Sequence, residues 1–409
     1  MRICVVYHGG EFPPSERIEK TAKSLAAAGH QVFLLCNNYG EFPLHEEIVG
    51  GVHVIRVRPT FRSRGWNRIL KFPVFFNPLW ILQLLAVIRR FHIDALQVVD
   101  VPLSLAAVYV GHACGLPVVL DMWENYPEFL RGRAKADWKT LVFRNYLVAR
   151  AAEICAVRRV DHIITVVEEQ RERLIADGVP EDRISVVTNA FDEEMFLRTP
   201  VGDDTPLDAE PGCYKLLYVG GLGVERGLED IIRAAPLVLA DIPELRIYIA
   251  GRGTEEHRLR KLAAHLGVAG HVHFLGWIPF ADIHSYIAKS DLCLVPHVYN
   301  AFINTTIPNK LFQYMALGKP VLVSHAKPLA RIVNESRCGF VFESGNPADA
   351  AAKILLAYRS LPDATIGERG RHSVQQRYTW ERAAAVLVRV YERLPTRRGR
   401  YTTSDHPAS

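Results

Sequence analysis

The feature that most constrains the fold is an alternation of short apolar segments and helix-like segments that occurs twice along the chain. The first series opens with Arg2–Tyr7 and Gln31–Cys36, and the second with 215–219 and 246–250. These segments lack the polar alternation of a half-exposed strand, and a helical stretch follows most of them. Strands of this kind, joined by helices, form parallel sheets that are covered on both faces. We therefore expect the α/β class, with two tandem Rossmann-like domains.

The boundary between the two series is marked by residues 199–212 (TPVGDDTPLDAEPG). This stretch has three prolines, two glycines and four acidic residues, which is typical of a linker. We predict an N-terminal domain at 1–198 and a second domain at 213–375, with a cleft between them. A C-terminal helix at 376–395 is expected to cross back to the first domain, and 396–409 to be a disordered tail.

Composition excludes several classes of protein. The 409 residues include 49 Lys and Arg against 44 Asp and Glu, a bias too small for a nucleic-acid-binding domain. The seven cysteines are scattered without a CxxC pair, HExxH is absent, and the first apolar segment is too short for a signal peptide. We expect a cytoplasmic protein with reduced thiols and no metal site.

One segment suggests contact with a membrane surface. Residues 72–88 form 17 uncharged residues, which is short for a spanning helix, and Pro73 and Pro78 interrupt them. Basic residues precede them without an acidic one among them: Arg56, Arg58, Arg62, Arg64, Arg68 and Lys71. Aromatic residues are interspersed: Trp66, Phe72, Phe75, Phe76 and Trp80. We expect peripheral binding to an anionic membrane at its inner face; in the alternative, Pro78–Phe91 is simply a buried helix.

Glycine pairs follow the first strand of each series. Gly9 and Gly10 end the first strand, and Gly220 and Gly221 end the first strand of the second half. Ligands of open parallel sheets bind beyond the carboxyl ends of the strands, where glycine lets the backbone approach phosphate. Neither pair has the G-x-G-x-x-G spacing of a dinucleotide site. Each pair alone is equally consistent with a tight turn.

Two stretches of the second half carry a family resemblance. They are 220–227 (GGLGVERG) and 307–320 (IPNKLFQYMALGKP). With the tandem halves and the terminal helix, they resemble the family-4 (group 1) retaining glycosyltransferases of GT-B fold, over residues 1–395. The resemblance implies a nucleotide-sugar donor site in the second half and an acceptor site in the first.

The resemblance also implies which residues bind the donor. Arg226 takes the position of the family's diphosphate-binding lysine, and the family's arginine position is Gly221, so Lys310 or Arg252 would have to supply the second cation. Thr305 and Gln313 stand where the family has two glutamates. The expected donor site comprises Gly220, Gly221, Leu222, Gly223, Arg226, Gly251, Arg252, Gly253, Gly276, Trp277, Thr305, Thr306, Asn309, Lys310 and Gln313.

The acceptor side is expected around residues 121–126, which follow a strand. The family often has Asp-x-His-Glu there, and Trp123 occupies the place of the histidine. Expected acceptor-side residues are Gly9, Gly10, Glu16, Arg17, Asp121, Trp123 and Glu124. In the alternative, Asp121 caps the following turn. Arg226, Lys310, Asp121 and Glu124 are the candidate catalytic residues.

The resulting hypothesis is a hexosyltransferase-type enzyme of cell-surface polysaccharide or lipopolysaccharide synthesis. It would move a sugar from a nucleoside diphosphate to a glycan or lipid-linked acceptor with retention of configuration, and without cofactor or essential metal. Two alternatives stay open: a nucleotide-sugar epimerase on the same fold, and a catalytically weakened partner subunit, suggested by the two missing carboxylates.

Overall fold

The computed structural model describes residues 1–8, 16–38, 44–57, 75–132, 145–197, 205–361 and 363–395. Gly9, Gly10, the tail from 396 and most of the basic segment before residue 75 lie outside these described residues. The chain divides into two compact units. Unit 1 comprises Met1–Val187 together with Ala383–Ser409, and unit 2 comprises Thr188–Arg382. Of the predicted linker, 205–212 are described, and they contain the short helix η2 (Pro206–Ala209).

Unit 1 is built on an eight-stranded sheet with the strand order β3-β4-β2-β1-β5-β6-β7-β8. All pairings are parallel except that between β3 and β4. The strands are β1 (Arg2–Tyr7), β2 (Gln31–Cys36), β3 (Glu46–Val49), β4 (Val52–Arg56), β5 (Ala95–Val99), β6 (Val118–Met122), β7 (His162–Thr165) and β8 (Ile184–Val186). The predicted parallel α/β architecture is confirmed for this unit.

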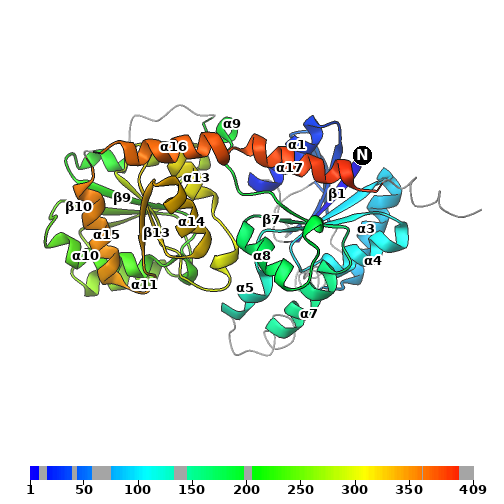
Figure 1. The fold of residues 1–409 in the computed structure, drawn as a ribbon, viewed down its shortest axis with the longest axis horizontal. Coiled ribbons are helices and arrows are strands. Elements are labelled where there is room, and N and C mark those ends of the chain that lie inside the picture. The colour runs from blue at the N-terminus through cyan, green and yellow to red at the C-terminus, as the bar shows by residue number, and fades with distance from the viewer. Residues whose placement is uncertain are drawn as a thin grey trace, which may run out of the picture. The chain divides into compact units, whose positions relative to one another are not determined.

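Helices cover both faces of this sheet (Figure 1). One face packs against α3 (Pro78–Phe91), α4 (Ser104–Cys114), α7 (Tyr146–Val157) and α8 (Glu168–Ala176) around the main core. Side chains of α1 (Glu16–Ala27) and α17 (Trp380–Arg393) reach the other face. The remaining helices are α5 (Tyr126–Gly132) and η1 (Glu181–Arg183). The last helix therefore belongs to unit 1 from Ala383 onward.

Unit 2 contains a six-stranded, wholly parallel sheet with the order β11-β10-β9-β12-β13-β14. The strands are β9 (Tyr214–Val219), β10 (Leu245–Ala250), β11 (Val272–Gly276), β12 (Leu292–Val295), β13 (Val321–Ser324) and β14 (Gly339–Phe342). Its helices are α9 (Glu193–Phe196), η3 (Val224–Arg226), α10 (Leu228–Leu239), α11 (Glu256–His265), η4 (Phe280–Asp282), α12 (Ile283–Ala288), η5 (Ile303–Thr305), α13 (Asn309–Ala316), α14 (Lys327–Ser336), α15 (Pro347–Arg359) and α16 (Thr365–Arg377). Because β9 pairs with β12, residues 76 positions apart in the chain, such as Leu216 and Leu292, lie side by side in this sheet.

The helix α3 begins and ends as its sequence indicates. Asn77 accepts a hydrogen bond from the Leu79 amide at 2.9 Å, and Pro78 occupies the first turn, where its missing N–H is harmless. Trp80 is buried in the core, whereas Phe76 is exposed. Among the described residues, no helix has both the length and the apolar content needed to cross a membrane.

Arg56 does not lie on a basic surface, as the sequence led us to expect. Its side chain is fully buried at the end of β4, where it pairs with the Glu47 carboxylate and donates to the Leu44 carbonyl at 3.0 Å. Strand pairing between β3 and β4 brings this carboxylate to it. Arg56 is therefore part of the fold of unit 1, and the predicted basic surface lies in residues outside the described part of the chain.

Candidate active site

At the carboxyl edge of the sheet in unit 2, the backbone of Gly220, Gly251 and Gly276 forms a surface without side chains, which we call the glycine ledge. The Gly220 amide donates to the Ala250 carbonyl at 2.8 Å, and the Gly251 amide donates to the Gly276 carbonyl at 2.6 Å. Gly251 has a φ of +140°, and a Cβ there would lie 1.9 Å from the Gly220 carbonyl oxygen. Only glycine fits this approach, so the ends of β9, β10 and β11 expose backbone rather than side chains.

The turn after β9 is held against the end of β12. Gly227 has a φ of +66°, and a Cβ on it would lie 1.8 Å from the Pro296 carbonyl oxygen. The Val298 amide donates to the Glu225 carbonyl at 3.0 Å, which ties the same two loops together. This packing fixes η3 and places its last residue, Arg226, at the edge of the sheet.

Two cations and a histidine meet at this edge. The Lys310 Nζ lies 3.9 Å from the centre of the Tyr218 ring, and 2.5 Å from the position that a Cβ of Gly220 would take. The Arg226 Nη1 lies 3.4 Å from the Nε2 of His297. The sequence left the second cation open between Lys310 and Arg252. The structure places Lys310 beside the glycine turn, whereas Arg252 is exposed to solvent.

The electrostatics of the cluster favour an anion. Burial and the Arg226 charge hold the pKa of Lys310 well below its usual value. Burial, Arg226 and Lys310 likewise hold the pKa of His297 well below its usual value, so this ring is neutral and can accept a hydrogen bond from Arg226. Arg226 has Glu225 at 3.7 Å, but within the described residues no carboxylate lies within ion-pair distance of Lys310. A bound anion would supply the missing negative charge.

The helix α13 carries Lys310 into this cluster. It begins at Asn309 after Pro308, and its Tyr314 hydroxyl accepts from the Val219 amide at 3.0 Å, which docks the helix on β9. Gln313 lies one turn after Lys310 and is 8% exposed. The contact between α13 and β9 therefore places Lys310 at the carboxyl edge of the sheet.

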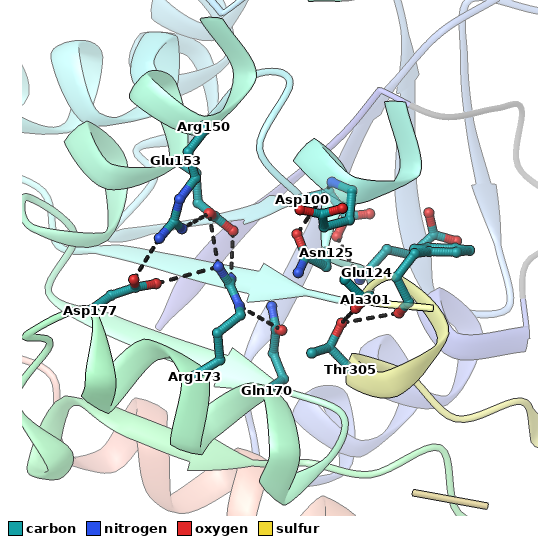
Figure 2. A network of polar contacts seen from close by, with 12 residues as sticks. Asp100, Glu124, Asn125, Arg150, Glu153, Gln170, Arg173, Asp177, Ala301 and Thr305 are labelled. Carbon is teal, nitrogen blue, oxygen red and sulfur yellow. Dashed lines mark hydrogen bonds and ion pairs between the residues drawn. The ribbon is translucent and has the colours of Figure 1, made fainter. Parts of the chain in front are cut away.

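Other predicted donor residues lie in different environments. The Thr305 hydroxyl bonds to the carbonyls of Ala301 and Phe302 at 3.1 and 3.0 Å, so it closes its own turn (Figure 2). Trp277 is 63% exposed beside Gly276. Gly253 is exposed, and Leu222 is buried. A Cβ on Gly221 would meet no atom within 4 Å, whereas a Cβ on Gly223 would lie 2.5 Å from the Glu225 carboxylate. Thr306 and Asn309 flank the start of α13 and are partly buried.

In unit 1, Asp121 is held inside the sheet rather than at its surface. Its Oδ1 accepts from the Arg17 guanidinium at 3.0 Å, and its Oδ2 accepts from the Gln97 amide at 2.9 Å. Both charged side chains of the pair are less than 7% exposed. Asp121 and Arg17 thus neutralise each other's charge. Asp121 does not cap the following turn, which was the alternative expected from the sequence.

The cap of that turn is Asp100, which the sequence reasoning missed. Its Oδ1 accepts from the amides of Trp123 and Glu124 at 2.8 and 3.3 Å. Asp100 has a φ of +55° at the end of β5, and burial and the Glu124 charge raise its pKa well above its usual value. Figure 2 shows Asp100, Glu124 and Asn125 close together. The signal available in the sequence was a polar residue directly after an apolar strand.

His8, at the end of β1, was also missed. Its Nδ1 lies 3.2 Å from the Val99 carbonyl, and burial lowers its pKa to about 4, so the neutral ring donates there. That bond leaves the Nε2 lone pair as an acceptor. His8 and Glu124 therefore lie at the ends of β1 and β6, on the same edge of this sheet. Glu16, in contrast, is paired with the buried Lys20 at 3.0 Å.

Figure 2 also shows a cluster of charged side chains on and beside α7 and α8 of unit 1. The fully buried Glu153 on α7 bonds to Arg150 and, at 2.6 Å, to Arg173 on α8, and both arginines also bond to Asp177. Every charge in this cluster has an opposite partner. We interpret it as a structural link between α7 and α8.

Comparisons with known proteins agree on the kind of fold. Family models match the chain as glycosyl transferases group 1 over residues 213–360 and as a glycosyl transferase 4-like domain over residues 14–190. An uncharacterized glycosyltransferase of Methanocaldococcus jannaschii is 25% identical over 398 residues, covering 93% of this chain and 96% of that protein.

Solved structures are similar over nearly the whole chain. Sucrose-phosphate synthase from Thermosynechococcus elongatus has a TM-score of 0.74 at 18% identity, covering 96% of this chain and 98% of that one. Anabaena HepE, solved in complex with UDP-glucose, has a TM-score of 0.69 at 16% identity, covering 96% of this chain and 100% of that one.

Proposed function

This chain belongs to the group 1 glycosyltransferases of GT-B fold, and we propose that it moves a hexose from a nucleoside diphosphate to a glycan or lipid-linked acceptor. The acceptor class we favour is that of cell-surface polysaccharide or lipopolysaccharide synthesis. Transfer would retain the configuration at the anomeric carbon, as the family-4 resemblance implies.

The observation that carries this proposal is the cation pair against the glycine ledge. Lys310 and Arg226 lie at strand ends where the backbone of Gly220 is open to a ligand, and Lys310 has no carboxylate partner within the described residues. A diphosphate has the charge and the oxygen acceptors that suit two such donors. As the sugar leaves, negative charge grows on that diphosphate, and fixed cations stabilise it most at that moment.

The reaction would need no dedicated carboxylate base. The bond between C1 of the sugar and the diphosphate oxygen breaks while the acceptor oxygen bonds to C1 from the same face. The acceptor hydroxyl proton passes to the departing phosphate oxygen. With Lys310 and Arg226 neutralising the leaving group, we propose that no metal ion is essential, and activity should persist in excess chelator.

We propose uridine as the donor base, supported by the UDP-glucose bound to the similar Anabaena HepE. Binding of UDP by the full chain, measured by calorimetry, tests the donor site directly. Transfer is then tested with UDP-glucose: UDP release that depends on an added glycan or lipid-linked acceptor supports it. Release of a free epimerised sugar would favour the epimerase, and UDP binding without turnover on any acceptor would favour the partner subunit.

We further propose that the protein binds anionic membranes peripherally through the basic residues between positions 58 and 71. At about 1 kcal/mol per basic residue near the surface, a few engaged side chains suffice at low salt. Co-sedimentation with phosphatidylglycerol vesicles tests this. Replacing Arg62, Arg64, Arg68 and Lys71 by Ser should abolish sedimentation without changing the circular dichroism. Wild-type protein that stays in the supernatant at low salt would contradict the proposal.

A further inference from the structure

A continuous chain of buried polar contacts runs through unit 1, and no step of the proposed reaction uses it. The Tyr391 hydroxyl on α17 donates to the Gln97 Oε1 at 2.6 Å, and the Gln97 Nε2 donates to Asp121 at 2.9 Å. Asp121 pairs with Arg17 at 3.0 Å, and the Arg17 Nη1 donates to the Val187 carbonyl at 3.0 Å. The four residues that it joins, Tyr391, Gln97, Asp121 and Arg17, are each at most 5% exposed.

One end of this chain of contacts lies where the polypeptide leaves unit 1, and the other lies on α17, the helix by which the polypeptide returns to it. Val187 is the last residue of unit 1 before the chain enters unit 2, and Tyr391 belongs to the segment that returns at Ala383. Any force transmitted along the backbone from unit 2 must enter unit 1 through one of these two segments. Both are tied by hydrogen bonds to the same ion pair.

The middle of the chain of contacts leads to the edge that carries the candidate acceptor residues. Asp121 lies two residues before Trp123, and the Arg17 guanidinium lies 5.8 Å from the centre of the Trp123 ring. A buried pair of this kind is costly to form, and its geometry is rigid only if every partner is in place. Loss of one partner should therefore displace the remaining side chains of the network.

We propose that Arg17, Asp121, Gln97 and Tyr391 form a positioning relay that sets the Trp123 loop according to how α17 and the segment at Val187 are held. Asp121 is then a positioning residue, acting through Arg17, and does not touch the substrate. The description of the loop as acceptor-binding rests on the proposed function, but the relay itself does not.

The test uses the full chain labelled with 5-fluorotryptophan, in which Trp123→Phe identifies the ¹⁹F resonance of Trp123. Tyr391→Phe removes one hydroxyl from the far end of the relay, and we expect it to shift the Trp123 resonance by more than its linewidth. The matched control is Tyr248→Phe in unit 2, since the buried Tyr248 hydroxyl has no hydrogen-bond partner among the described residues. This control should leave the resonance in place.

A double-mutant comparison separates a relay from two independent effects. Arg17→Lys should also shift the Trp123 resonance, and adding Tyr391→Phe to it should produce little further shift, because the relay is already broken. Independent sites would instead give additive shifts. An unmoved resonance in Tyr391→Phe, or additive shifts in the double variant, would overturn the proposal. If Tyr391→Phe does not fold, Gln97→Met provides the same test.

UDP titration distinguishes this result from the donor-site proposal. Tyr391→Phe should bind UDP as wild type does, within about twofold, because Lys310 and Arg226 belong to unit 2. Reduced UDP affinity in this variant would contradict a role confined to the Trp123 loop. A wild-type protein that does not bind UDP would contradict the proposed function and leave the ¹⁹F result standing.

Discussion

The Lys310 ammonium lies 3.9 Å from the centre of the Tyr218 ring, although 91 residues separate the two in the sequence. The contact exists because β9 and β12 are neighbours in the sheet, and α13 follows β12. This contact orients the Lys310 ammonium toward the glycine turn, and no ion pair with another described residue holds it there. The first two predictions follow from this arrangement.

The cation pair should dominate the affinity for nucleoside diphosphate. Lys310→Ala and Arg226→Ala should each weaken UDP binding by about 1.5–3 kcal/mol, the usual contribution of a charge-assisted hydrogen bond. Arg252→Ala is the matched control, because its side chain is exposed and should change the affinity by less than about 0.5 kcal/mol. Calorimetric titration with UDP measures all three. If Arg252→Ala lost more affinity than Lys310→Ala, the second diphosphate-binding cation would be Arg252 and not Lys310.

Without an anion, Lys310 should destabilise the protein. Its folded pKa lies below the ordinary 10.5, so between these two values the unfolded chain binds more protons and stability rises with pH. Lys310→Met should raise the free energy of unfolding by about 1 kcal/mol near pH 7, with roughly 2–4 °C in Tm. The gain should shrink as pH approaches 10.5. Urea unfolding at pH 7, 8 and 9 checks this, and a gain that grows with pH contradicts it.

Gln313→Glu should keep UDP affinity or raise it by up to about fivefold. Lys310 lies three positions earlier on α13, where it can compensate a carboxylate at 313. Gln313→Leu, which removes the acceptor, is the contrasting variant and should weaken binding. Titration at pH 6 and pH 8 measures the effect. A tenfold loss at pH 8 that recovers at pH 6 would mean that the pocket rejects the buried charge.

His8 should make the protein sensitive to acid. Its pKa falls from 6.5 in the unfolded chain to about 4 in the fold, so between these values the unfolded chain binds more protons and stability falls as the pH is lowered. His8→Asn keeps a donor for the Val99 carbonyl without the titration. It should remove about 1–2 kcal/mol of the acid-dependent loss between pH 6.5 and pH 4.5. If the free energy of unfolding fell equally with pH in wild type and His8→Asn, His8 would contribute nothing to the acid sensitivity.

Arg56 should contribute to stability and not to vesicle binding. Arg56→Met removes the buried member of the pair with the partly exposed Glu47 and should lower the free energy of unfolding by about 2–4 kcal/mol. Arg89→Met, on an exposed position of α3, should cost less than about 0.5 kcal/mol. Neither change should alter sedimentation with anionic vesicles. If Arg56→Met reduced sedimentation while remaining folded, Arg56 would have to be exposed to the membrane.

The sequence by itself determined the two parallel sheets, because strands buried on both faces have to be continuously apolar and helices have to cover them. It also determined the bounds of α3, Pro78–Phe91, since a proline is tolerated in the first turn of a helix and not in its interior. These are local rules, and each can be read from a window of about ten residues. The donor edge of unit 2 was predicted from the glycines that follow its strands and from the family resemblance, and the tests above address it.

Only the tertiary structure decided which polar side chains meet. Asp121 and Asp100 each come directly after a run of apolar residues, yet one is buried against Arg17 and the other caps the loop at Trp123. Arg56 looked like its basic neighbours until β3 brought Glu47 to it. The physical reason is that a polar group's environment is set by strand order, which joins residues distant in the chain, whereas periodicity reports only which face of its own element a residue occupies.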